Sequence, residues 1–214
     1  MEKSDNKIYY LLILDRSGSM QSCAQSAISS FNEQLQLIKS LNRKYKDQEI
    51  LVSLTLFNQE VNIVVERMRP DSVKELTFRT YNPDGMTALN DAIGISVAKL
   101  DQAIREEVRA GLASAIVVII TDGYENASMA WNDAAIRNLI KEYESTGKWT
   151  FSYLGSTPDA VEIAANLNID ASRSAIFAQD VVGEAFEMLN ESIEEYIATP
   201  VKDKTVFSLK RKKR

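Results

Sequence analysis

The stretch that organises this chain is residues 8–20, which read IYYLLILDRSGSM. Its apolar run, Ile8–Leu14, predicts a buried strand, and helical periodicity begins soon after the loop that follows. In that loop, Asp15, Ser17 and Ser19 place oxygen-bearing side chains at alternate positions. Ligands of open α/β sheets lie at the carboxyl ends of strands, and oxygen ligands suit Mg²⁺, Ca²⁺ or Mn²⁺. The stretch therefore predicts a strand, a metal-binding loop and a helix.

Strand and helix patterns alternate along the rest of the chain. Apolar runs and period-two alternation predict strands at 8–14, 50–57, 61–65, 115–120, 149–154 and 175–178. Helical spacing predicts helices at about 20–44, 86–110, 131–143, 158–167 and 180–196, and a short helical turn at 72–76. We expect Asp180 to cap the last of these helices.

Two of these strands show how the sheet is arranged. The loop at Asn58 and Gln59 is too short for a parallel crossover, so the strands on either side of it form a hairpin. Ala115–Ile120 is continuously apolar, which is typical of a central parallel strand covered on both faces. We therefore expect a doubly wound, mostly parallel six-stranded α/β sheet. Val61–Val65 should be its one antiparallel edge strand, and helices should cover both faces.

Two later segments place oxygen-bearing side chains at similar junctions. Thr87 lies where a turn-rich loop enters a predicted helix, and Asp122 follows the strand Ala115–Ile120. If that strand neighbours Ile8–Leu14 at the point where the strand order reverses, Asp15 and Asp122 lie side by side. Adjacent carboxylates repel each other, and a divalent cation between them removes that cost. Taken singly, Asp15 and Thr87 could be helix caps and Asp122 a turn residue, so the argument depends on the complete set.

The complete set resembles the metal-ion-dependent adhesion site of von Willebrand factor type A domains. Its parts are Asp15-x-Ser17-x-Ser19, Gly85-Met86-Thr87-Ala88-Leu89 and Thr121-Asp122-Gly123. Their order, separations and strand-end positions match that family. The resemblance covers roughly residues 6–198. It is greatest to the small intracellular bacterial or phage members, rather than to the secreted adhesion receptors.

This resemblance implies a role for each residue of the set. Ser17 and Ser19 would bind the ion directly, Thr87 would join them in a ligand-ready form, and Asp15 and Asp122 would act mainly through bound waters. The expected ion is Mg²⁺, with Mn²⁺ or Ca²⁺ as possible substitutes. Neutral hydroxyls donate little charge, so the ion would still attract one more anionic oxygen. We therefore expect a partner protein to supply an Asp or Glu carboxylate, and the domain to be a non-catalytic interaction module.

Other interpretations of the same residues lead to different functions. In one, the ion is structural, within a scaffold or metal-sensing component whose partner contacts lie elsewhere. In another, Asp15 is the nucleophile of a magnesium-dependent phosphohydrolase or phosphotransferase, although such enzymes usually have a second acid where Ser17 stands. An EF-hand is excluded because the loop lacks further acidic ligands, and a P-loop because Trp149 stands where Ser or Thr is required. Tyr124–Asn126 should lie near the metal, either as a determinant of partner choice or as a solvated loop.

The composition narrows the possible chemistry and location. The 214 residues contain no histidine and a single cysteine, Cys23. Histidine-ligated zinc, Ser-His-Asp and Cys-His catalysis and an internal disulfide are therefore excluded. No apolar stretch approaches the roughly 20 residues of a membrane span, and the N-terminus lacks a signal-peptide pattern. We expect a cytoplasmic protein in which Cys23 is a packed side chain rather than a redox group.

Charge is unevenly distributed along the chain. Residues 201–214 hold seven of the 25 basic residues and one of the 30 acidic residues, so the net charge of −5 becomes −11 for the first 200 residues. We expect an N-terminal extension at 1–6, one domain at 7–198 and a flexible basic tail at 199–214. The cluster Lys210–Arg214 is either solvated or a weak contact for an anionic partner.

Overall fold

A single mixed sheet forms the centre of the molecule. The computed structural model describes residues 6–178, 182–199 and 207–209. In this part of the chain, six strands lie in the order β3-β2-β1-β4-β5-β6. They are β1 (Lys7–Asp15), β2 (Glu49–Phe57), β3 (Val61–Met68), β4 (Ala113–Thr121), β5 (Trp149–Gly155) and β6 (Ser174–Ile176). Only β2 and β3 pair antiparallel, which confirms the predicted mostly parallel sheet with one antiparallel edge strand.

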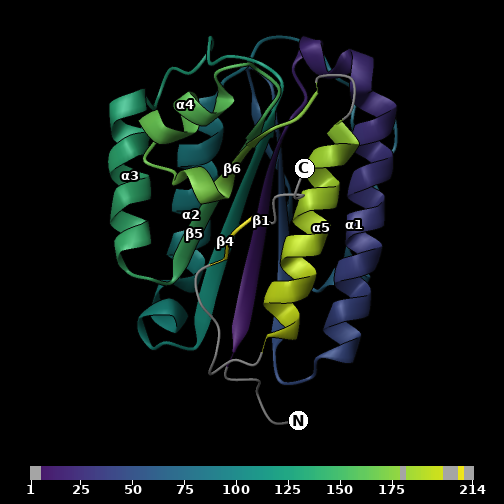
Figure 1. Cartoon of the computed structure of the whole chain (residues 1–214), viewed down its shortest axis with the longest axis vertical. Coiled ribbons are helices and arrows are strands. Elements are labelled where there is room, and N and C mark those ends of the chain that lie inside the picture. Colours follow the sequence, from purple (N-terminus) through teal and green to yellow (C-terminus); the bar gives the residue numbers. More distant parts are fainter. Residues whose placement is uncertain (1–5, 179–181, 200–206, 210–214) are drawn as a thin grey trace.

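Helices cover both faces of this sheet. The α-helices are α1 (Ala24–Lys44), α2 (Leu89–Arg109), α3 (Asp133–Ser145), α4 (Ala160–Asn166) and α5 (Val182–Ala198). Short 3₁₀ turns are η1 (Gly18–Cys23), η2 (Pro70–Ser72) and η3 (Ala171–Arg173). Figure 1 shows α1 and α5 on one side of the sheet and α2, α3 and α4 on the other. Among the described residues, no helix has the length and apolar character needed to cross a bilayer.

The central strand β1 contributes to two hydrophobic cores. Tyr10 and Leu12 pack with α1 and α5, whereas Leu11 and Ile13 pack with α2, α3 and α4. All four side chains are at most 2% exposed. Because both faces are covered, the strand is apolar at successive positions rather than at alternate ones. The same reason accounts for the continuous apolar run of β4.

The strand order brings two loops to one edge of the sheet. Strand β1 lies between β2 and β4, and Leu14 is in register with Ile120. The chain therefore moves outward from β1 in both directions, which makes the end of β1 a topological switch point. The loops that follow β1 and β4 lie together at the upper edge in Figure 1.

The predicted helical turn at 72–76 is wrong. A 3₁₀ turn begins at Pro70, because proline is favoured at the first helical position. This turn ends at Ser72. The following residues have no regular structure. Instead, the Asn32 side chain satisfies the backbone there, donating to the Leu76 carbonyl at 3.0 Å and accepting from the Leu76 N–H at 2.8 Å.

Some predicted helix and strand boundaries also shift. The helix expected from Trp131 begins at Asp133, because Asn132 caps it by accepting from Ala135 N at 2.9 Å. Trp131 packs on α2 instead, where a Cβ at Gly94 would lie 2.3 Å from its indole ring. Strand β3 extends beyond the predicted 61–65, and β6 and α4 are shorter than predicted. The predicted cap Asp180 lies outside the described residues.

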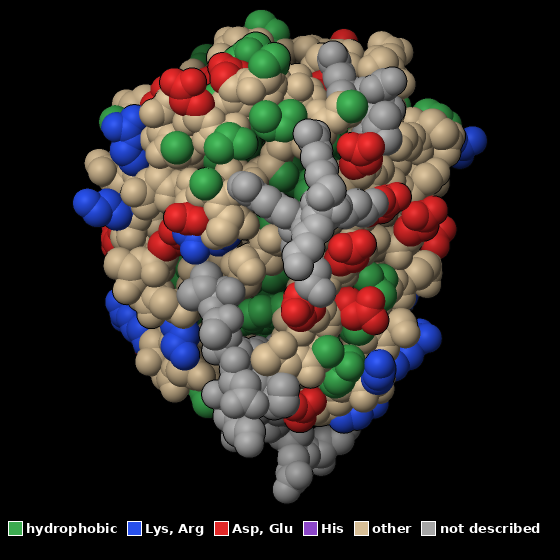
Figure 2. All heavy atoms as spheres, viewed as in Figure 1, with side chains coloured by type: hydrophobic (Ala, Val, Ile, Leu, Met, Phe, Trp, Pro, Cys, Tyr) green, Lys and Arg blue, Asp and Glu red, His purple; other side chains and the backbone are tan. Residues whose placement is uncertain are grey.

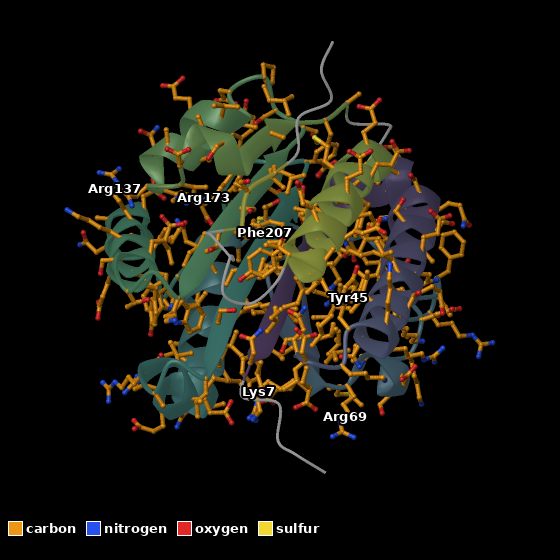
Figure 3. The ribbon with its side chains drawn as sticks, turned by 60° about the horizontal axis from the view of Figure 1, so that its bottom comes forward. Lys7, Tyr45, Arg69, Arg137, Arg173 and Phe207 are labelled. Carbon is orange, nitrogen blue, oxygen red and sulfur yellow. The ribbon has the colours of Figure 1, made fainter. Side chains whose placement is uncertain are left out.

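Part of the predicted C-terminal tail is packed on the domain. Phe207 and Leu209 are 1% and 7% exposed and belong to the core of α1 and α5. The Phe207 ring meets the Tyr196 ring edge-on at 5.8 Å, and Figure 3 shows it beside α5. These two residues therefore pack on the domain, within the range 199–214 that was predicted to be a flexible basic tail. The basic cluster Lys210–Arg214 lies outside the described residues.

Candidate metal site

The five predicted site residues come together at the edge of the sheet where β1 and β4 end. They come from three separate parts of the sequence: the loop after β1, the segment before α2 and the loop after β4. All but one are at most 6% exposed, and Ser19 is the exposed member. The five residues are Asp15, Ser17, Ser19, Thr87 and Asp122.

Asp15 is a fully buried acid at the end of β1. Its carboxylate accepts from Ser17 N and from Thr121 Oγ1, each at 2.6 Å. Burial raises the pKa of Asp15 to about 6, these hydrogen bonds oppose the increase, and the charge of Asp122 adds to it. No Lys or Arg forms an ion pair with Asp15 among the described residues. The ionised carboxylate is therefore hydrogen-bonded but has no protein cation beside it.

The two serines and Asp122 form a short chain of oxygen atoms. Ser17 Oγ lies 3.1 Å from Ser19 Oγ, and Ser19 Oγ donates to Asp122 Oδ1 at 2.5 Å. The alternate spacing of the serines directs both hydroxyls to the same side of the loop. In this way a loop after β1 reaches the acid that follows β4.

Thr87 is positioned by the loop after β4. Its N–H donates to Asn126 Oδ1 at 2.8 Å, and Asn126 N donates to the Thr87 carbonyl at 3.0 Å. A Cβ at Gly123 would lie 3.2 Å from Thr87 Oγ1 and 3.5 Å from Ser19 Oγ, so both hydroxyls border the Gly123 backbone. The residue preceding α2 as its cap is Ala88, without a side-chain capping bond. The alternative interpretation, in which Thr87 is only the N-cap of α2, is therefore wrong.

Glu125 supports this arrangement through hydrogen bonds that were not predicted from the sequence. One carboxylate oxygen accepts from Ala127 N and Ser128 N, and the other accepts from Asn90 N and Ser128 Oγ. Glu125 therefore joins its own loop to the first turn of α2, next to Thr87. The contact with Asn90 spans 35 residues, so no local pattern could have revealed it. Tyr124–Asn126 is therefore not simply a solvated loop, and Tyr124 stays 54% exposed beside the site, so a role in partner choice stays a prediction.

Glycine allows the loop before α2 to approach the loop after β1. Gly85 has φ +79°, and a Cβ there would lie 1.7 Å from Gln59 Oε1. Its carbonyl accepts from Gly18 N at 3.0 Å. The buried Tyr81 hydroxyl also donates to the Asp15 carbonyl at 2.6 Å. These contacts explain why the turn-rich segment before Thr87 is ordered around the site.

The oxygen atoms at this edge suit a hard divalent cation. An octahedral Mg²⁺ with bonds of 2.0–2.1 Å places neighbouring ligand oxygens about 3 Å apart. The 3.1 Å separation of Ser17 Oγ and Ser19 Oγ is close to this value. The described residues contain no group of three or more Asp, Glu, Cys or His side chains that could hold a metal. A cation would therefore be held by hydroxyls together with the paired carboxylates, a donor set without nitrogen or sulfur.

Comparison with known proteins identifies the family. The model of the von Willebrand factor type A domain matches residues 11–180, so this chain belongs to that family. Domains of this family are protein-interaction modules and are generally not enzymes. A search of curated proteins found no match.

Solved structures share the fold at low sequence identity. The von Willebrand domain of the type V pili tip protein Mfa5 from Porphyromonas gingivalis is 11% identical, with a TM-score of 0.62, and the match covers 90% of this chain and 97% of that one. The PilB minor pilin from Streptococcus sanguinis is 11% identical, with a TM-score of 0.60 and coverages of 91% and 63%. A von Willebrand factor type A protein from Catenulispora acidiphila is 14% identical, with a TM-score of 0.58 and coverages of 87% and 42%. This chain thus spans less than two thirds of the last two proteins.

Proposed function

We propose that this domain binds a partner protein through a divalent cation, which the partner reaches with an Asp or Glu side chain. The cation would be held at Asp15, Ser17, Ser19, Thr87 and Asp122 as a metal-ion-dependent adhesion site. The single observation that carries the proposal is that two neighbouring carboxylates, Asp15 and Asp122, are almost fully buried. Among the described residues, the Asp15 carboxylate accepts hydrogen bonds only from N–H and O–H groups of Ser17 and Thr121. Two such charges repel each other unless a cation lies close to both.

The chain's own groups divide the work at this site. Asp15 and Asp122 supply negative charge from beneath, and the hydroxyls of Ser17, Ser19 and Thr87 supply neutral oxygens. Ser19 is the exposed member of the set and marks the side from which a partner approaches. When bound, Mg²⁺, or Mn²⁺ or Ca²⁺ in its place, would offer an open coordination position to an anionic oxygen. Because the hydroxyls carry no charge, they leave the cation attractive to a carboxylate.

Synthetic peptides can test the proposal without knowledge of the partner. A fluorescent peptide library with a fixed central Asp is compared with a matched library that has Asn there, each in MgCl₂ and in EDTA. We expect binding of the Asp library in MgCl₂ only, and loss of this binding in Thr87→Ala. Equal binding in EDTA, or equal binding of the Asn library, contradicts the proposal.

The same variant separates the proposal from a purely structural ion. If the ion only stabilises a scaffold or metal-sensing domain, Thr87→Ala changes the stabilisation by metal but leaves partner binding intact. Phosphatase chemistry at Asp15 would instead appear as turnover of a generic phosphate ester that Asp15→Asn abolishes. We expect no such turnover.

We propose a cytoplasmic location for this domain, as in the small intracellular members of the family. The supporting observation is Cys23, which is buried and unpaired with another cysteine, and whose thiol pKa burial raises to about 11. A packed, unreactive thiol suits a reducing compartment. Fractionation of cells that express the protein tests this location. An anionic partner for Lys210–Arg214 also stays a proposal. Removal of residues 210–214, which keeps the buried Phe207 and Leu209, and a salt-dependent DNA-binding measurement would test it.

A further inference from the structure

A small pocket adjoins the candidate metal site. It has a volume of about 180 Å³ and lies between the loop after β4 and the helices α2, α3 and α4. Gly123 lines this pocket and also borders the hydroxyls of Ser19 and Thr87, so the pocket and the site share a wall. Small-molecule sites usually measure roughly 300–1,000 Å³, and this pocket is smaller. Its size fits one side chain of a partner that is bound at the adjoining metal site.

One residue that lines this pocket has a buried hydroxyl without a partner among the described residues. Tyr153 lines the pocket and is 1% exposed, yet its hydroxyl has no hydrogen-bond partner among the described residues. Buried polar groups in native proteins are nearly always hydrogen-bonded, and an unbonded group lowers stability. The Tyr153 hydroxyl is therefore an unused hydrogen-bonding group at the pocket wall, and a small shift of the side chains that cover it would let a ligand group reach it.

The remaining walls of the pocket are apolar, acidic or neutral polar, and the neutral polar side chains are Asn90, Tyr124 and Asn166. Leu89, Ile163 and Leu167 supply apolar surface, and the acids are Glu125 and Asp133. No Lys or Arg is among the described residues that line it.

The two acids differ in how much hydrogen-bonding capacity they have left. Glu125 already accepts four hydrogen bonds, which fills the lone-pair sites of a carboxylate. Asp133 is exposed and accepts from Asn90 Nδ2 at 2.7 Å. The exposed Arg137 of α3 donates to the Asn166 carbonyl at 2.6 Å, and Figure 3 shows its side chain pointing outward. Asp133 is thus the acid at which a further donor can bind.

The charge of the whole domain favours a basic ligand at this place. Residues 1–200 carry a balance of −11, since they hold 18 of the 25 basic and 29 of the 30 acidic residues. Figure 2 shows acidic side chains over α4, where Glu162 is exposed, and along α5. A partner segment with only an acidic residue would approach against this field. A basic residue near that acid would offset the repulsion.

We propose that this pocket takes a Lys or Arg side chain from the partner segment whose carboxylate reaches the metal site. The inference rests on the proposed function. The aliphatic stem lies against Leu89, Ile163 and Leu167, and the charged head donates to the Asp133 carboxylate and the Tyr153 hydroxyl. The domain therefore recognises an acidic residue and a basic residue a short distance apart in one segment.

Labelled heptapeptides test this inference. Each has a central Asp among Gly and Ser residues, and one further position is scanned with Lys, Arg, Gln or norleucine in MgCl₂. At one or two positions we expect Lys or Arg to improve affinity roughly five- to tenfold over norleucine, the gain from one charge-assisted hydrogen bond at a partly exposed site. Equal affinity of the Lys and norleucine peptides overturns the inference.

Three variants locate the effect in the pocket. Tyr153→Phe should lower the Lys-peptide affinity roughly two- to tenfold and leave protein stability unchanged or higher, because the lost hydroxyl has no partner in the free protein. Asp133→Asn should also reduce the advantage of Lys over norleucine. Asn166→Trp should block the pocket, whereas Ala165→Trp, an exposed neighbour on α4 that does not line it, is the matched control. Unchanged affinities in both Tyr153→Phe and Asn166→Trp place the basic side chain elsewhere and contradict the inference.

The parent peptide separates the two proposals. If the peptide with Asp alone binds in MgCl₂ but Lys adds nothing, only the pocket inference fails. If no Asp peptide binds in MgCl₂, the proposed function fails and the inference fails with it.

Discussion

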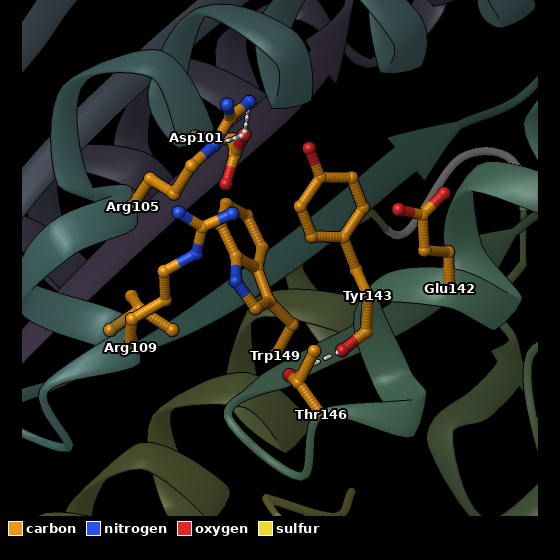
Figure 4. Close-up of a pocket in the computed structure, with 8 residues that line it drawn as sticks. Asp101, Arg105, Arg109, Glu142, Tyr143, Thr146 and Trp149 are labelled. Atoms are coloured by element: carbon orange, nitrogen blue, oxygen red, sulfur yellow. Dashed lines mark hydrogen bonds and ion pairs between the residues drawn. The ribbon is translucent and has the colours of Figure 1, made fainter.

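Two buried acids at opposite ends of the sheet have different surroundings. At the amino end, Asp101 is 5% exposed and accepts from Arg105 Nε at 2.8 Å, beside a cavity of about 290 Å³. Figure 4 shows Arg105 and Arg109 on one side of this cavity and Tyr143 on the other, with Trp149 between them. Burial and a hydrogen bond to Asp101 raise the pKa of Tyr143 to about 12. At the carboxyl end, Asp15 is 0% exposed and has no such cation.

This difference indicates which end is prepared for a ligand. The negative charge of Asp101 is balanced by Arg105 within the protein, so Asp101 does not require a cation from solution. The charge of Asp15 is held by Ser17 N and Thr121 Oγ1 and lies near a second acid. A site that keeps the buried Asp15 carboxylate close to a second acid, with no ion pair to Asp15 among the described residues, is suited to a cation from solution. The cavity beside Asp101 is larger than the pocket beside the candidate metal site, but the surroundings of Asp15 say more about function.

The largest effect on stability is expected at Glu125. Replacing it with Ala removes four hydrogen bonds: three within the loop after β4, from Ala127 and Ser128, and one from Asn90 N of α2. We expect the free energy of unfolding to fall by about 2–4 kcal/mol, because several backbone donors lose a charged acceptor. Urea unfolding measures the change, and Glu162→Ala on the exposed face of α4 is the control. A loss no larger than that of the control would show that Glu125 does not hold the loop.

A smaller loss is expected at the paired acid. Asp101→Ala removes the partner of Arg105 and of the Tyr143 hydroxyl, so we expect a loss of about 1–3 kcal/mol. The loss should be the same with and without MgCl₂, as measured by thermal unfolding. Glu106→Ala, which breaks the exposed pair with Arg109, should change stability very little. A magnesium-dependent effect of Asp101→Ala would remove the contrast between the two ends.

Asp15, which has no ion pair among the described residues, should behave differently from Asp101: its replacement should change the effect of MgCl₂ on stability. Asp15→Asn keeps a side chain of the same shape: the amide oxygen can still accept from Ser17 N, and the amide N–H can donate to Thr121 Oγ1 in place of the bond that this hydroxyl now donates. Without metal, we expect the free energy of unfolding to stay the same or rise by up to about 1–2 kcal/mol, because a buried charge is removed. The added stability that MgCl₂ gives the native protein should disappear. Strong destabilisation of Asp15→Asn in EDTA would mean that the protein already balances the charge of Asp15.

The smallest effect on stability is expected at the exposed hydroxyl. Ser19→Ala should change the free energy of unfolding by no more than about 0.5 kcal/mol, as at most surface positions. It should nevertheless lower Mg²⁺ affinity at least about tenfold, since second-shell changes alone cost that much at other metal sites. Ser22→Ala, an exposed serine one turn further along η1, is the matched control. Equal Mg²⁺ affinities in the two variants would exclude Ser19 from the site.

The sequence predicted the fold because its signals are local. The continuous apolar runs of β1 and β4 identify central strands, and the three-residue gap between Phe57 and Val61 requires a hairpin. The resulting strand order brings Asp15 and Asp122 to one edge, as expected. The metal itself, the ion it prefers and the partner stay predictions.

Features that depend on distant contacts were not predicted. Asn32 replaces the expected helical turn at Leu76, and its contacts span 44 residues. Glu125 and the unpartnered hydroxyl of Tyr153 likewise become visible only when the loop after β4 is placed beside α2 and β5. Phe207 lies in a segment that the basic residues around it made resemble a solvated tail. In each case one side chain acquires its role from a surface built by another part of the chain.

Calorimetric titration of the metal-free protein with MgCl₂ tests the central claim most directly. We predict a single saturable site in the native protein, and a stabilisation of about 2.7 kcal/mol when free Mg²⁺ is a hundred times the dissociation constant. Asp101→Ala should keep the site, and Asp15→Asn should lose it. No uptake of Mg²⁺ or Mn²⁺ by the native protein, or equal uptake by Asp15→Asn, would contradict the claim that this edge of the sheet binds a cation.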